Sequence, residues 1–398
     1  MTIINQTSLA KLRKDTPGCQ TVLHFNNAGA ALPPRQVVDV IKKHLDLEAS
    51  IGGYEAADLV LPDIETFYQA AARLISCDPQ EIAFTENATR AWEMAFYSLK
   101  FKPGDRILTS VSEYASNYLA FLHKAKQTGI IIDVINDDAE GQLDIEDLKQ
   151  KLNENVKLIA ITHVPTQGGL VNPAVAVGKI ANDYNIPYLL DTTQSVGQLP
   201  IDVNEIGCDF LCATGRKYLR GPRGTGFLYA KKAMMDQCDP PFVDLHAATW
   251  VADEEYVLRA DARRFETWEQ NIAAKLGLRA AINYALNIGI STIWHRIQFL
   301  AEKLREQLAQ IPHLELQDLG RQKCGIVTFC SERKSVTEIR EHLSRKKINV
   351  SISLQEYARL DMAKRNLPAL LRASVHYYNS EEEVDVFCRE VASVLSRK

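Results

Sequence analysis

The chain has 398 residues, of which 46% are apolar and 24% charged, and its formal net charge is −4 at pH 7. The apolar fraction excludes a disordered chain, and the slightly acidic charge gives no electrostatic footprint for nucleic acid. No stretch approaches the roughly 18 consecutive apolar residues of a membrane span, and the first residues lack the apolar core of a secretory signal. We therefore expect a cytoplasmic protein that binds neither membranes nor nucleic acids, with two domains or one large α/β domain and an appendage.

The cysteines give no sign of a metal site. Eight of them are spread over the whole chain without a CxxC pair, and none of the nine histidines has a ligand-like spacing to them. We expect reduced cysteines that are mostly buried as small apolar side chains, and no bound metal.

Strands and helices alternate in the sequence up to about residue 265. Short apolar runs predict the strands, and apolar residues at helical spacing predict the helices. Because the strands are apolar throughout, they indicate a mostly parallel sheet covered on both faces. The expected elements are strand 80–85, helix 87–99, strand 105–110, a helix from about residue 116, strand 156–164, helix 173–184, and strands 186–191, 210–213 and 226–230.

After Glu266 the pattern changes to one typical of a smaller α+β domain. The expected elements there are helices 273–289 and 293–311, strand 325–329, helix 336–346, strand 371–376 and a final helix 380–396 that opens on a capping box. We place the domain boundary near residues 265–285. The expected division is an N-terminal arm (1–20), a large domain (21–270) and a small C-terminal domain (271–398).

Chemically useful side chains follow three of the predicted strands. Asp191 ends one strand, Lys217 follows another, and the turn 87–89 opens the helix after a third. Open α/β sheets bind ligands at the carboxyl ends of their strands. Pyridoxal phosphate needs a lysine amine for a Schiff base, a carboxylate beside its pyridine nitrogen, and a helix N-terminus for its phosphate. These residues together predict a site for that cofactor, and Thr214 and Arg216 offer further phosphate ligands.

Motifs over almost the whole chain resemble those of a known family. The segment DTTQSVGQLP, followed by CATGRKYLRGPRGTG, is similar to the core of the class V aminotransferases, the branch of fold-type-I pyridoxal-phosphate enzymes that contains the cysteine desulfurases. The other resembling motifs, in the family's order, are HFNNAGAALPP, FTENATRAWEMAF, SVSEYASN, ITHVPTQGGLVNP, RFETWEQN and LRASVHYYNSEEEVD. The resemblance implies an α/β fold with a mostly parallel seven-stranded sheet covered by helices, a small C-terminal α+β domain, and a homodimer whose RFETWEQN segment reaches the partner's active site.

The resemblance also implies a role for each matching residue. Lys217 would be the catalytic Schiff-base lysine and proton shuttle, Asp191 would pair with the pyridine nitrogen, and Gln194 would lie near the ring hydroxyl. Arg372 would bind the substrate carboxylate through a two-pronged contact, for which a guanidinium is suited. The other implied cofactor residues are Ala88, Thr89, Tyr114, Thr166, Thr214 and Arg216, and the other substrate residues are Ala28, Tyr54 and Arg359.

The chain departs from the family's pattern at several positions. Tyr114 stands at the ring-stacking position and Arg216 stands before the lysine, where the family usually has histidine, and Thr166 stands where asparagine is usual. The loop 348–371, where cysteine desulfurases keep the cysteine that forms a persulfide, contains no cysteine. A desulfurase with a persulfide relay is therefore disfavoured.

The pattern is most similar to the pyridoxal-phosphate C–S lyases, such as the hercynylcysteine sulfoxide lyases. It predicts β-elimination from an S-substituted cysteine or its sulfoxide, a small amino-acid substrate, to give a sulfur product, pyruvate and ammonia. One alternative is an aminotransferase or epimerase of an amino-acid-like substrate. A more remote one is a non-catalytic binding protein with the same fold, against which Lys217, Asp191 and Arg372 argue. We expect Cys324 and Cys330 to be core residues without a chemical role.

Overall fold

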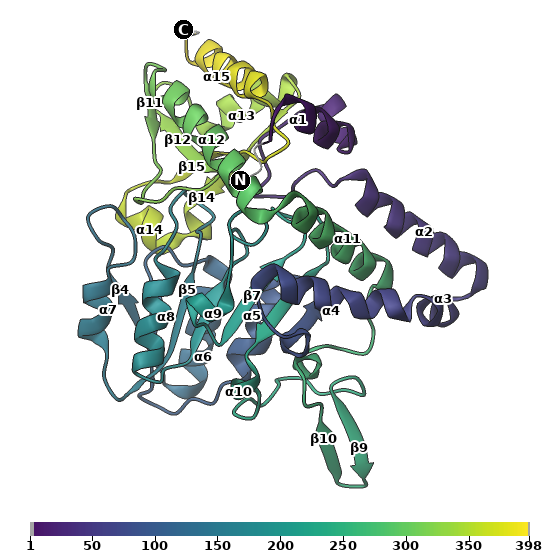
Figure 1. Cartoon of the computed structure of the whole chain (residues 1–398). Coiled ribbons are helices and arrows are strands. Elements are labelled where there is room, and N and C mark those ends of the chain that lie inside the picture. The colour runs from purple at the N-terminus through teal and green to yellow at the C-terminus, as the bar shows by residue number, and fades with distance from the viewer. Residues whose placement is uncertain (1–3, 397–398) are drawn as a thin grey trace.

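The computed structural model describes residues 4–396, and a seven-stranded sheet forms the centre of its large domain (Figure 1). Neighbouring strands run parallel except β8, which is antiparallel to both β7 and β2. The sheet is thus mostly parallel and seven-stranded, as expected. In spatial order the strands are β2 (Ile82–Thr85), β8 (Gly226–Ala230), β7 (Phe210–Thr214), β6 (Tyr188–Asp191), β5 (Val156–Thr162), β3 (Arg106–Ser110) and β4 (Ile131–Ile135).

Both faces of this sheet are buried, which explains why its strands are apolar at successive positions. In β5, Leu158 and Ala160 join one apolar cluster, whereas Ile159 and Ile161 join the other. The first cluster also holds side chains of α5 (Ala88–Ser98) and α6 (Ala115–Thr128). The second includes side chains of α4 (Leu61–Ile75) and α8 (Ala174–Asp183). Alternate side chains of each strand therefore pack against different helical layers.

The remaining helices surround the sheet and lead into the small domain. Helix α11 packs against α2 and α4, so it belongs to the outer layer of the large domain as well as connecting it to α12 (Figure 1). The helices not yet given are α1 (Gln6–Lys14), α2 (Arg35–Ile51), α3 (Gly53–Leu59), α7 (Ile145–Lys151), α9 (Val203–Ile206), α10 (Lys232–Met235), α11 (Ile272–Ile288), α12 (Ile290–Ala309), α13 (Val336–Arg345), α14 (Arg359–Lys364) and α15 (Glu381–Ser396).

The small domain is built on an antiparallel sheet with the order β11 (Leu314–Leu316), β12 (Ile326–Ser331), β15 (Ala369–Ser374) and β14 (Ser351–Leu354). The N-terminal segment lies against this domain, because β1 (Leu23–His24) pairs with β13 (Ile348–Asn349). Arg13 also forms an ion pair of 2.8 Å with Glu383 of α15. The division of the chain into arm, large domain and small domain stays a prediction.

The predicted elements begin and end within about three residues of the observed ones. The sequence analysis did not predict β4, nor the hairpin formed by β9 (Ala248–Ala252) and β10 (Glu255–Leu258). This hairpin extends away from the large domain at the bottom of the view in Figure 1. Its strands are largely exposed, so their residues carry no pattern of one buried face.

The described residues contain neither a membrane-spanning helix nor a cluster of metal-ligating side chains. No helix within residues 4–396 has both the length and the apolar character needed to cross a bilayer. In the same residues, no group of three or more His, Cys, Asp and Glu side chains is arranged to hold a metal ion. The cytoplasmic location stays a prediction.

Candidate active site

A cavity of about 390 Å³ lies where the parallel strands of the large domain end. Thr162, Asp191 and Thr214, the last residues of β5, β6 and β7, line it, together with the start of α5. Its volume is within the roughly 300–1,000 Å³ typical of small-molecule sites. All the residues that we expected to hold the cofactor line this one cavity: Ala88, Thr89, Tyr114, Thr166, Asp191, Gln194, Thr214, Arg216 and Lys217.

Lys217 lies in a tight turn that follows β7. Its carbonyl accepts a hydrogen bond of 2.9 Å from the backbone N–H of Arg220, which has the left-handed φ of 62°. The buried guanidinium of Arg220 donates to the carbonyl of Leu32 at 2.8 Å, which anchors the turn against the N-terminal segment. Burial, followed by the charges of Arg216 and Arg372, lowers the pKa of Lys217 well below its ordinary value. A lowered pKa favours the neutral amine, which is the form that acts as a nucleophile or a base.

Asp191 is buried at the end of β6, and both of its oxygens are held. Oδ1 accepts from the backbone N–H of Thr193 at 2.8 Å, and Oδ2 accepts from Nδ2 of Asn117 at 2.9 Å. Asn117 also lines the cavity, and the sequence analysis did not identify it. The available signal was its place in SEYASN, where Asn117 follows Tyr114 by three residues and so shares its side of the first turn of α6.

The first turn of α5 provides the geometry for an anion. The side chain of Asn87 caps the helix by accepting from the backbone N–H of Arg90 at 2.9 Å, and Ala88 and Thr89 present the other N–H groups of this turn at the cavity wall. Gly226 allows the close approach of strand and helix, because a Cβ at that position would lie 3.0 Å from the backbone carbon of Asn87. Arg216 adds a guanidinium to the same cavity and donates to the carbonyl of Gly29.

Arg372 on β15 does not itself line the cavity, but it contacts Thr166, which does. Its Nη1 donates to the carbonyl and to the hydroxyl of Thr166, at 3.0 and 2.6 Å. Burial lowers the pKa of Arg372 to about 10, so the side chain remains a cation at neutral pH. Gln194 donates from Nε2 to the carbonyl of Ala28 at 3.1 Å, which places Ala28 beside the cavity wall.

Two buried polar atoms at this place have no protein partner: Nε of Arg372 and Oε1 of Gln194. Buried polar groups are normally hydrogen-bonded, so an unpaired donor and an unpaired acceptor indicate that a ligand completes the site. A buried lysine with a lowered pKa, a fixed carboxylate and a helix N-terminus are also present. The residues therefore fit pyridoxal phosphate together with an amino-acid carboxylate.

Two predicted substrate residues lie elsewhere. Tyr54 is on α3 and is 71% exposed, and Arg359 is exposed at the start of α14. Neither lines the cavity. Their contribution to substrate binding stays a prediction, and for Tyr54 it would require a site on another molecule.

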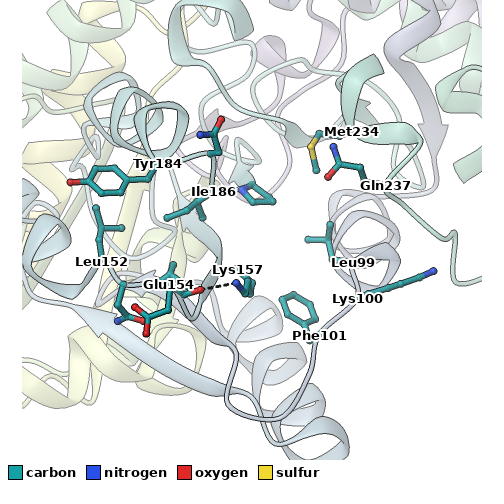
Figure 2. Close-up of a pocket in the computed structure, with 14 residues that line it drawn as sticks. Leu99, Lys100, Phe101, Leu152, Glu154, Lys157, Tyr184, Ile186, Met234 and Gln237 are labelled. Carbon is teal, nitrogen blue, oxygen red and sulfur yellow. Dashed lines mark hydrogen bonds between the residues drawn. The ribbon is translucent and has the colours of Figure 1, made fainter.

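Another hollow, of about 540 Å³, lies near the amino ends of β5 and β6 (Figure 2). Lys157 and Glu154 are among its lining residues, and Nζ of Lys157 donates to the backbone carbonyl of Glu154 at 2.7 Å. This hollow is larger than the cavity at the carboxyl ends, but none of the predicted site residues lines it. We therefore assign the active site to the smaller cavity, where lysine, carboxylate and helix N-terminus converge.

Comparisons with known proteins identify the family and the fold. The family model described as "Aminotransferase class-V" matches residues 23–387. A protein of Pyrococcus abyssi named "Probable cysteine desulfurase" is 31% identical over 387 residues, covering 94% of this chain and 95% of that protein. The apo structure of a cysteine desulfurase from Thermococcus onnurineus is 28% identical, with a TM-score of 0.91 and coverage of 99% and 98%. The cystine C–S lyase C-DES has a TM-score of 0.85 at 23% identity, covering 95% and 99%, a likeness that concerns the fold alone.

Proposed function

The chain belongs to the class-V aminotransferase family, and on that premise we propose that it eliminates the sulfur group from an S-substituted cysteine or the corresponding sulfoxide. The fold is the fold-type-I fold expected from the sequence, the cofactor is pyridoxal phosphate, and the protein is a lyase that depends on it. The proposed reaction releases a sulfur product and aminoacrylate, which water converts to pyruvate and ammonia.

Pyridoxal phosphate, when bound, withdraws electrons from the Cα of an amino acid that is joined to it. Lys217 takes the proton from Cα, because it lines the cavity and burial lowers the pKa of its Nζ, which favours an amine that acts as a base. The Cα–H bond then breaks with its proton on Lys217, and the Cβ–S bond breaks with its electron pair on sulfur. No group on the enzyme has to accept sulfur in this reaction.

The other side chains of the cavity bind and orient. Asp191, fixed through both oxygens, provides the carboxylate that keeps a pyridine nitrogen protonated. Arg372 offers its unpaired Nε to the substrate carboxylate. Tyr114 provides an aromatic face at the cavity wall, although its phenol cannot act as the acid or base that an imidazole provides.

The observation that carries the proposal concerns the cysteines. None of them lines the cavity, and burial raises the pKa of all eight, to about 12 for Cys324. A cysteine that accepts sulfur must react as a thiolate and needs a lowered pKa at an accessible place. Direct elimination to a free sulfur product requires no such residue.

Cysteine desulfuration is the second candidate, because the similar proteins carry that name. It removes sulfur from cysteine, leaves alanine instead of pyruvate, and transfers the sulfur to an enzyme cysteine. Sequence similarity favours this candidate, and the composition of the cavity favours direct elimination. The two reactions differ in their organic product, which makes them simple to separate.

The test is an assay of the protein loaded with pyridoxal phosphate against cysteine, S-alkyl cysteines and their sulfoxides, with pyruvate and alanine both measured. We expect pyruvate in amounts equal to the sulfur product, no alanine, and no requirement for a keto acid. Cys324→Ala and Cys330→Ser should retain pyruvate formation within about threefold, since neither thiol is near the cavity. Lys217→Ala is the negative control.

Three outcomes would contradict the proposal. Alanine together with an enzyme-bound persulfide would establish the desulfurase. A requirement for a keto acid would establish an aminotransferase, and inversion at Cα without loss of sulfur would establish an epimerase.

We further propose that the active enzyme is a homodimer. Large exposed apolar side chains gather on the hairpin β9–β10 and on the segments before and after it, and we call this set the hairpin patch: Phe242, Val243, Leu245, Trp250, Val251, Tyr256, Val257 and Trp268. A hairpin of two strands is only marginally stable alone, and apolar patches of this kind are typical of protein interfaces. Trp268 belongs to RFETWEQN, the segment expected to reach the partner.

A further inference from the structure

The reaction proposed above does not use one buried carboxylate that lies close to Asp191. Glu113, between β3 and α6, is 3% exposed. Its two oxygens accept four hydrogen bonds: from the hydroxyls of Thr109 (3.0 Å) and Thr162 (2.5 Å), the backbone N–H of Tyr114 (2.8 Å) and the amide of Asn117 (2.9 Å). Four hydrogen bonds to one buried carboxylate indicate that Glu113 belongs to an ordered polar network.

The amide of Asn117 connects this carboxylate to Asp191. Its Nδ2 donates to Oε1 of Glu113 and to Oδ2 of Asp191, at 2.9 Å in each case. An amide nitrogen carries two hydrogens, so both are used. If the amide turned over, its oxygen would face two carboxylates and repel both of them. Glu113 therefore fixes which way Asn117 points, and Asn117 fixes one oxygen of Asp191.

We propose that Glu113 is a positioning residue that acts through Asn117 to hold Asp191 against the pyridine nitrogen of the cofactor. The inference rests on the proposed role of Asp191 in that contact. Glu113 itself does not line the cavity, so it touches neither cofactor nor substrate. Its effect is to give the carboxylate of Asp191 one orientation before the cofactor arrives, with each oxygen retaining a free acceptor site.

The charge of the network supports this role. Burial, together with the neighbouring Asp191, raises the pKa of Glu113 to about 7. The other titratable groups facing the pair are the thiol of Cys212 and the amine of Lys217, both of which interact with Asp191. An ionised Glu113 places a second negative charge behind Asp191, which favours a proton on the pyridine nitrogen in front of it.

The test compares Glu113→Gln with Asp191→Asn and with Thr109→Val. A glutamine keeps the size of Glu113 and removes its negative charge, so its oxygen accepts more weakly from Asn117 and holds that amide less firmly. Thr109→Val is the matched control, because Thr109 contacts Oε2 of Glu113, the oxygen not used by Asn117. The measurements are the pH midpoint of the bound cofactor's visible absorbance, the cofactor dissociation constant without substrate, kcat, KM and the melting temperature.

We expect Glu113→Gln to move the absorbance midpoint in the same direction as Asp191→Asn and to weaken cofactor binding. Its kcat should fall about tenfold while KM changes less than twofold, the size of effect known for groups that orient a reacting ligand. Thr109→Val should lower the melting temperature and leave the midpoint unchanged. Glu113→Asp should recover part of kcat, because the carboxylate is retained.

The inference fails if Glu113→Gln lowers the melting temperature but leaves the absorbance midpoint and the cofactor dissociation constant as in the unmodified protein. Should Glu113→Gln not fold, Asn117→Ser breaks the same connection without changing Glu113, and an unchanged midpoint in that variant overturns the inference equally. Failure of the proposed role of Asp191 gives a different result. If Asp191→Asn itself leaves the absorbance midpoint unchanged, Asp191 does not contact the cofactor as proposed, and the inference about Glu113 is then also wrong.

Discussion

Lys217 has the environment of a reactive amine, because it is 8% exposed and lies near two arginines that disfavour a further positive charge. Lys217→Ala should abolish covalent attachment of pyridoxal phosphate, measured by mass spectrometry of the protein after borohydride reduction. Lys157→Ala is the matched control, since Lys157 lines the other hollow (Figure 2). That variant should keep the attached cofactor. Covalent cofactor in Lys217→Ala would mean that another lysine carries it.

At the level of single residues, the sequence predicted most of the groups expected to hold the cofactor and missed Asn117, which also lines the cavity. Asp191 and Lys217 could be found because each follows a strand, and the family motifs added Gln194 and Tyr114. Asn117 could not be found in this way, because its partner Asp191 is 74 positions away and no local pattern reports a contact between α6 and β6. Tyr54 was predicted from a segment whose sequence says little about which residues contact the substrate. In the structure it is exposed and does not line the cavity of the same chain.

Among the elements, the segment RFETWEQN contributes a buried ion pair that holds α11 to the sheet. Glu266 accepts from the backbone N–H of Phe84 on β2 at 2.7 Å and lies 3.8 Å from Nζ of Lys275 on α11, and both charged side chains are buried. Burial alone would raise the pKa of Glu266, but Lys275 and hydrogen bonds from His246 and Phe84 hold it at about 2. The carboxylate of Glu266 is thus ionised in the folded protein, and its charge is stabilised by Lys275, His246 and the backbone of Phe84.

Lys275→Met should therefore lower the free energy of unfolding by about 3–5 kcal/mol, the usual cost of leaving one member of a buried pair without the other. Because the pKa of Glu266 is depressed in the folded state, its stabilisation is present above about pH 4.5 and is lost as the pH falls toward 2. In Lys275→Met, the free energy of unfolding should fall less than in the unmodified protein as the pH decreases over this range. Urea unfolding at several pH values checks both points, and Lys149→Ala, which breaks an exposed pair with Glu146, should cost less than about 1 kcal/mol. Equal losses in the two variants would contradict this assignment.

Elements of the central sheet were predictable because burial on both faces makes most successive residues of a strand apolar, as in β5 and β7. Edge and isolated strands lack that signal. Strand β4 lies at the edge of the sheet with Ile131 exposed, and the hairpin β9–β10 packs on neither layer. Their residues lack the run of buried apolar positions that marks the inner strands.

For the whole molecule, the hairpin patch predicts self-association. Trp250→Glu combined with Tyr256→Glu should convert the dimer to a monomer at micromolar concentration, because charges on exposed apolar strands oppose their burial at an interface. Light scattering coupled to size exclusion measures the mass. Val175→Glu on α8 is the control, because Val175 is exposed outside the hairpin patch, and it should leave the dimer intact. An active monomer in the unmodified protein would refute the proposal.

The segment 24–31 connects the last strand of the chain with the cavity. Asn27 donates from Nδ2 to the carbonyl of Ser374 at 2.7 Å, across 347 positions of sequence, while the carbonyl of Ala28 accepts from Gln194. During synthesis the ribosome releases the first of these partners long before the last one exists. The cavity wall at Ala28 can therefore reach its final form only after the ribosome has released Ser374. Cofactor capture by the finished site thus follows the synthesis of β15. The contact between Asn27 and Ser374 also closes a long loop, and the entropic cost of that closure slows folding.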